Sequence, residues 1–97
     1  MINNAAEAYK RQQVMTATPE ALTLMLYNGA LRFMKEGLEA KEAKEWERCN
    51  NSLQKAQKII REFQATLKME YDISKQLMPL YDYVYNGLVE ANMKSKP

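Results

Sequence analysis

Apolar residues recur at helical spacing along three stretches of the chain, and short polar segments separate them. The first stretch opens with Thr18-Pro19-Glu20. A threonine hydroxyl caps helices well, proline suits the first helical position, and Glu20 would lie at the positive end of the helix dipole. These helix-start residues, together with the apolar spacing that follows them, predict a helix that begins at Thr18 and ends at about Lys41.

This first helix would have an unusually wide apolar surface. Its apolar side chains cover roughly 260° of a helical wheel, whereas roughly 100° suffices for a surface helix. They are Leu22, Leu24, Met25, Leu26, Tyr27, Ala30, Leu31, Phe33, Met34 and Leu38. Such a helix must be covered on more than one side, so it is either the central helix of a bundle or partly faces a partner.

A second helix is predicted over 45–69, after a polar turn at Lys41-Glu42-Ala43-Lys44. Its apolar residues alternate in steps of three and four, which is typical of a heptad seam with one buried edge. They are Trp46, Cys49, Leu53, Ala56, Ile60, Phe63 and Leu67. A third helix is predicted over 72–94, and Pro79 within it indicates a kink or a fresh start.

These elements predict an all-α protein, an antiparallel helical bundle over 18–97 preceded by a segment over 1–17. Two interpretations of that segment remain open. It is either a disordered end or a strap in which Tyr9, Val14 and Met15 fold onto an apolar groove and cap it.

Composition narrows the function. A chain of 97 residues suffices for one domain. The net charge is +2, and the Lys and Arg residues are interleaved with acidic residues. The sequence therefore lacks the basic stripe that is typical of nucleic-acid binding. One cysteine and no secretion signal favour the reducing cytoplasm. No apolar run is long enough for membrane insertion.

The sequence argues against catalysis, metals and cofactors. It contains no histidine, so the commonest general base and metal ligand is missing. There is no glycine-rich phosphate loop. The acidic residues sit beside Lys or Arg at polar helix positions, which is typical of surface ion pairs. Cys49 falls on the predicted seam, where a small core residue is favoured over a nucleophile.

Several short motifs together resemble the flagellar export chaperone family FliS. They are Ala8-Tyr9-Lys10, Val14-x-Thr16-Ala17-Thr18-Pro19-Glu20, Leu22-Thr23-Leu24-Met25-Leu26-Tyr27-Asn28-Gly29-Ala30, Leu53-x-Lys55-Ala56-Gln57-x-Ile59-Ile60, Tyr81-Asp82-Tyr83 and Leu88-x-Glu90-Ala91-Asn92. They span nearly the whole chain in the family's order, and the N-terminal block is the most specific.

The resemblance implies a cytosolic chaperone with a four-helix bundle. Its client would be the disordered C-terminal segment of flagellin, kept from premature polymerisation and delivered to a component of the export gate. It also implies that the N-terminal segment, with Tyr9 and Val14, can lie over a groove and move aside. The family continues past Asn92 with a last long helix, which this sequence does not contain, so we expect self-association or helix exchange between copies.

We therefore expect client contacts from the N-terminal segment and from the second side of the first helix. The candidate residues are Tyr9, Val14, Leu24, Tyr27, Leu31 and Met34. The alternative is a structural helical-bundle homodimer without a client, in which the wide apolar arc is buried against a second copy.

Overall fold

The structure is a computed structural model that describes residues 5, 7, 8, 11, 12 and 18–95. Within residues 18–95 it forms three long helices: α2 (Pro19–Glu42), α3 (Trp46–Thr66) and α4 (Asp72–Lys94). The described residues contain no strand. The prediction of an all-helical fold is confirmed, whereas the four-helix bundle remains a prediction.

The start of α2 follows from its first residues. Thr18 is the N-cap, and its Oγ1 accepts a hydrogen bond from the Ala21 backbone N–H at 3.1 Å. Pro19 occupies the first turn, where its missing N–H costs nothing. The helix ends one residue after the predicted Lys41. Lys44 then turns the chain with a φ of 60°, and the Glu45 N–H donates to the Ala40 carbonyl oxygen at 2.8 Å.

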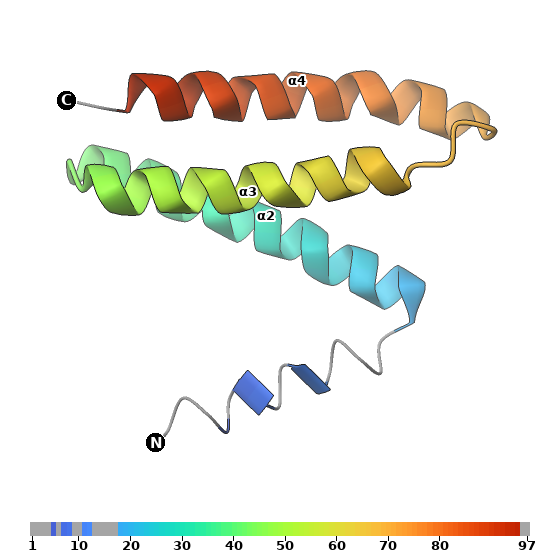
Figure 1. The fold of residues 1–97 in the computed structure, drawn as a ribbon, viewed down its shortest axis with the longest axis horizontal. Coiled ribbons are helices and arrows are strands. Elements are labelled where there is room, and N and C mark those ends of the chain that lie inside the picture. Colours follow the sequence, from blue (N-terminus) through green and yellow to red (C-terminus); the bar gives the residue numbers. More distant parts are fainter. Residues whose placement is uncertain (1–4, 6, 9–10, 13–17, 96–97) are drawn as a thin grey trace.

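The middle helix of the fold is α3, which lies between α2 and α4 (Figure 1). Its heptad seam forms the centre of the core. The buried apolar residues of the core cluster are Ala40, Cys49, Leu53, Ala56, Ile60, Phe63 and Leu88. The wide apolar arc predicted either a central helix or a helix that partly faces a partner. In the described residues α2 is not central, because it packs on α3 along one side. Leu24, Leu31 and Leu38 of α2 remain exposed.

The close approach of α2 to α3 depends on Gly37. A Cβ atom added to this buried glycine would lie 2.9 Å from Leu53 Cδ2 and 3.1 Å from Leu53 Cγ. Real side chains do not approach so closely without displacing a neighbour. The absence of a side chain at Gly37 therefore lets the backbone of α2 lie against Leu53.

The last helix, α4, is continuous through Pro79, so the expectation of a fresh start at this residue is wrong. Pro79 is exposed, so water can hydrate the carbonyl group that loses its helical partner. Two side-chain hydrogen bonds among the described residues join α3 to α4 and to its C-cap residue Ser95. Gln64 Nε2 donates to Asp82 Oδ1 at 2.7 Å, and the buried Ser95 hydroxyl donates to Asn50 Oδ1 at 2.8 Å.

Candidate functional site

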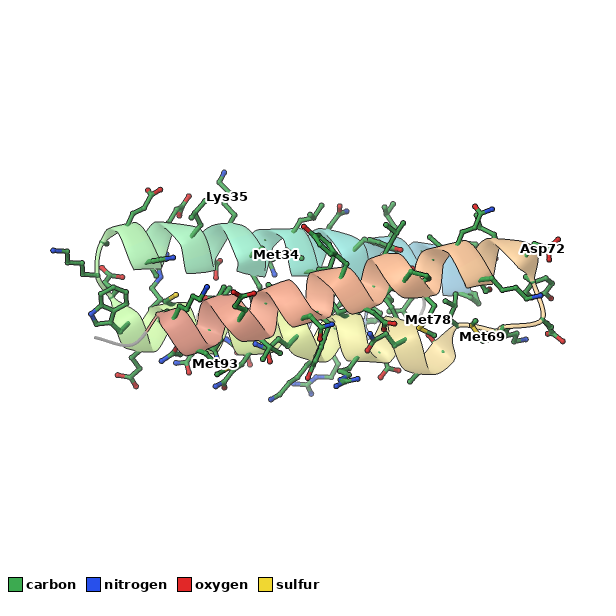
Figure 2. All side chains as sticks on the ribbon, turned by 90° about the horizontal axis from the view of Figure 1, so that it is seen from above. Met34, Lys35, Met69, Asp72, Met78 and Met93 are labelled. Atoms are coloured by element: carbon green, nitrogen blue, oxygen red, sulfur yellow. The ribbon has the colours of Figure 1, made fainter. Side chains whose placement is uncertain are left out.

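An open apolar groove runs between α2 and α4, with α3 as its floor. It contains two hollows of about 270 Å³ and 210 Å³ that adjoin at Met34. The larger hollow is lined by Tyr27, Ala30, Leu31, Met34, Ile60, Leu77, Leu80, Tyr81 and Val84. The smaller is lined by Met34, Gly37, Leu38, Lys41, Cys49, Leu53, Leu88 and Ala91. Figure 2 shows Met34 on the side of α2 that faces α4, with Lys35 pointing away from it.

The rims of this groove carry leucines and an isoleucine at heptad spacing. Leu24, Leu31 and Leu38 follow one another at seven-residue intervals on α2 and are 61%, 62% and 58% exposed. Ile73 and Leu80 are seven residues apart on α4 and are 58% and 59% exposed. Residues seven apart lie on one face of a helix. Each wall therefore exposes a row of apolar side chains that repeats every seven residues, as in an amphipathic helix. An exposed apolar surface of this kind is typical of an interaction site.

Two residues that line the larger hollow, Tyr27 and Tyr81, stack on a third aromatic ring, that of Phe63. Phe63 of α3 is buried between the two tyrosines, with its ring centroid 4.5 Å from that of Tyr27 and 5.6 Å from that of Tyr81. The hydroxyl groups of Tyr27 and Tyr81 are hydrogen-bonded to each other. Among the described residues, this is the hydrogen bond that connects α2 to α4. Burial and the hydrogen bond to Tyr27 raise the pKa of Tyr81 to about 12, so the Tyr81 hydroxyl is protonated at neutral pH.

Four of the six predicted contact residues lie at this groove. Tyr27, Leu31 and Met34 line the larger hollow, and Leu24 continues the rim of α2. Tyr9 and Val14 lie outside the described residues. Whether these side chains bind a client stays a prediction, because the described residues contain no bound segment.

The sequence prediction did not include the second wall of the groove. Leu77, Leu80, Tyr81 and Val84 of α4 line the larger hollow. Their helical period was visible in the sequence, but a period alone does not distinguish a stripe that packs on a core from one that lines a groove. No signal in the sequence showed that α4 would lie opposite α2.

A different cleft, of about 620 Å³, lies between α3 and α4 and is lined mainly by polar residues. The Arg61 guanidinium lies 3.8 Å from the centre of the Tyr85 ring in this cleft. Gln57 Nε2 and Asn92 Oδ1 are buried there without a hydrogen-bond partner among the described residues. These two unpaired atoms do not by themselves indicate a ligand.

The described part of the chain has neither a candidate metal site nor a membrane-spanning helix. Residues 18–95 and the five described residues before them hold no cluster of His, Cys, Asp or Glu that could bind a metal ion. No described helix has a stretch long and apolar enough to cross a membrane. Cys49 is fully buried, as expected for a core residue, and a buried thiol is not accessible to a substrate.

Comparison with known proteins gives consistent matches along the chain. The family model "Flagellar protein FliS" matches residues 1–97. A flagellar secretion chaperone FliS from Bacillus subtilis (strain 168) is 46% identical over 94 residues, which cover 97% of this chain and 71% of the relative. A flagellar secretion chaperone FliS from Vibrio cholerae is 31% identical over 102 residues, which cover 99% of this chain and 75% of the relative.

Proposed function

Because this chain belongs to the FliS family of flagellar proteins, we propose that it is a flagellar secretion chaperone that binds flagellin in the groove between α2 and α4. The FliS family is a family of chaperones and not of enzymes, which agrees with the prediction that this chain is not an enzyme. Membership of the FliS family does not favour the alternative hypothesis, a structural helical-bundle homodimer without a client.

The open groove is the observation that carries the proposal. Its walls are apolar, its rims have the period of an amphipathic helix, and helices that dock in grooves are a common mode of peptide recognition. The C-terminal segment of flagellin would fold as it binds. The cost of ordering that segment lowers its net affinity, which favours later release.

Three further elements of the proposal concern residues or partners that the structure does not describe. Residues 1–17, with Tyr9 and Val14, would cover part of the groove before the client arrives. In full-length relatives a fourth helix would complete the bundle by packing on α3 between α2 and α4, and the client would then bind along the exposed rims of the groove. The complex would form in the cytosol and be handed to a component of the export gate. Removal of residues 1–17 should then strengthen client binding.

The proposal is tested by calorimetric titration of the chain with a peptide from the flagellin C-terminus. We expect binding near 1:1 with a negative heat-capacity change, because apolar surface is buried. Leu31→Asp places a charge on the rim of the groove and should weaken binding about tenfold or more.

The matched control is Met93→Asp. Met93 is 72% exposed on α4 and lines neither hollow, so this variant should bind like the unmodified chain. Equal affinities for Leu31→Asp and the unmodified chain would show that the client binds elsewhere. No binding by the unmodified chain would refute the proposed function for these 97 residues.

A further inference from the structure

The polar cleft between α3 and α4 contains an arginine that is stacked on an aromatic ring. The guanidinium carbon of Arg61, on α3, lies 3.8 Å from the centre of the Tyr85 ring, on α4. Arg61 is exposed and Tyr85 is half-buried, so the ring supports a guanidinium that water can reach. The attraction between the cation and the ring restricts where the arginine side chain lies.

A short chain of hydrogen bonds holds one edge of the same guanidinium. Gln64 Nε2 donates to Asp82 Oδ1 of α4 at 2.7 Å, and Gln64 Oε1 accepts from Arg61 Nη1 at 3.3 Å. A guanidinium carries five N–H donors, and this contact uses one. The others have no hydrogen-bond partner among the described residues. Arg61 is therefore held in place while most of its donors stay free.

The charged residues that line this cleft are two cations and one acid, namely Lys58, Arg61 and Glu62. Lys58 and Arg61 are three residues apart on α3, so they are neighbours on the surface of that helix. Neither of the two cations forms an ion pair with a carboxylate in the part of the chain that the structure describes. The wall formed by α3 thus offers two unpaired cations to an occupant.

This cleft is separate from the groove between α2 and α4. The residues that line it include none of those that line the two hollows of the groove. A helix that fills the groove would therefore leave the cleft uncovered.

We propose that the cleft binds an acidic segment of a partner protein, with one carboxylate on the free N–H groups of Arg61 and a second beside Lys58. The planar guanidinium matches a carboxylate through two parallel hydrogen bonds. Because Tyr85 and Gln64 already restrict Arg61, less side-chain freedom is lost on binding. A nucleic acid fits less well, because its affinity depends on many phosphate contacts and Glu62 would repel a polyanion. The proposal does not depend on the proposed function, since it involves neither the groove nor flagellin.

The probe for this experiment is a rhodamine-labelled peptide that alternates Glu and Ala and is capped at both ends. Fluorescence anisotropy at low ionic strength, where ion pairs are least screened, should show that it binds the chain. The same peptide with Gln in place of Glu should bind at least about tenfold more weakly, because it lacks the charge-assisted hydrogen bonds.

Variants of Arg61 distinguish a shaped site from simple attraction between charges. Arg61→Gln should weaken binding of the acidic peptide about tenfold or more. Arg61→Lys should also weaken it, because lysine keeps the charge but has no planar fork of donors. Lys75→Gln is the matched control, since Lys75 is exposed on α4 and does not line the cleft. It removes the same charge as Arg61→Gln and should bind like the unmodified chain.

Four outcomes would overturn the proposal. The first is that the acidic peptide does not bind the unmodified chain. The second is that Arg61→Lys binds it as tightly as the unmodified chain, which would show that only the charge matters. The third is that Lys75→Gln weakens binding as much as Arg61→Gln, which would indicate a general charge effect. The fourth is that a single-stranded oligonucleotide binds more tightly and displaces the peptide, which would assign the surface to nucleic acid.

Discussion

Alanine at Gly37 and alanine at Gly87 should change stability in opposite directions. Both glycines lie inside helices and have negative φ angles, so alanine can adopt the backbone conformation at each. Replacing an interior helical glycine by alanine stabilises a helix by about 0.5–1 kcal/mol. The surroundings of the added methyl group then decide whether the variant is more or less stable than the unmodified chain.

At Gly87 the methyl group would meet no atom within 4 Å, so the full gain of about 0.5–1 kcal/mol is expected. For a chain of this size that raises the melting temperature by roughly 3–6 °C. At Gly37 the methyl group would lie 2.9 Å from Leu53 Cδ2, and Leu53 is buried in the core. Overpacking costs about 1–3 kcal/mol, so Gly37→Ala should destabilise the chain by up to about 2 kcal/mol after the helix gain is subtracted.

Thermal and urea unfolding followed by circular dichroism at equal protein concentration would measure both effects. Gly29→Ala is the matched control, because its methyl group would make an ordinary 3.6 Å contact with Ile59 Cδ1 and should stabilise the chain. A Gly37→Ala variant as stable as Gly87→Ala would refute the close approach of α2 to α3.

Four other predictions follow from the same contacts. Lys44→Gly should raise the free energy of unfolding by about 0.5–1 kcal/mol in urea titrations, because Lys44 has a left-handed backbone conformation that favours glycine; an unchanged midpoint would contradict this. Ultraviolet titration should show Tyr81 ionising near pH 12. Since its folded pKa is raised above the ordinary value of 10, its contribution to stability is present below pH 10 and is lost as the pH rises toward 12, and unfolding midpoints independent of pH over this range would count against it. Phe63→Ala should cost about 3–5 kcal/mol in denaturant unfolding, because Phe63 is buried between two aromatic rings; a loss below 1 kcal/mol would be inconsistent with that packing. Gel filtration with light scattering should show self-association of the 97-residue chain through its exposed rims, reduced in Leu31→Asp, whereas a clean monomer of the unmodified chain would contradict it.

The elements that the sequence predicted well are those whose signals are local. The cap at Thr18 and the proline at Pro19 define the start of α2 through groups within one turn. The seam of α3 is regular because one edge of that helix is buried along its length, from Cys49 to Phe63. In both cases the neighbours in sequence determine the structure.

Features that depend on distant neighbours were not predictable in the same way. A helical wheel showed that α2 is apolar on several sides, but not which side α3 would cover. Pro79 suggested a break in α4, yet the helix continues through this residue. The pairing of Tyr27 with Tyr81 joins residues 54 positions apart, and nothing in the local pattern of either indicates the other.

The central position of α3 has a consequence for how the groove can respond to a client. Its walls, α2 and α4, are each packed on α3, and the hydrogen bond between Tyr27 and Tyr81 is the one that joins them directly among the described residues. An occupant that spreads the walls must stretch or replace this bond, whereas one that fits between them leaves it intact. The width of the groove and the hydrogen bond between Tyr27 and Tyr81 are therefore coupled. An occupant that is too bulky both loses apolar contact and breaks this bond, so a poor fit costs more binding free energy than the apolar surface alone would give.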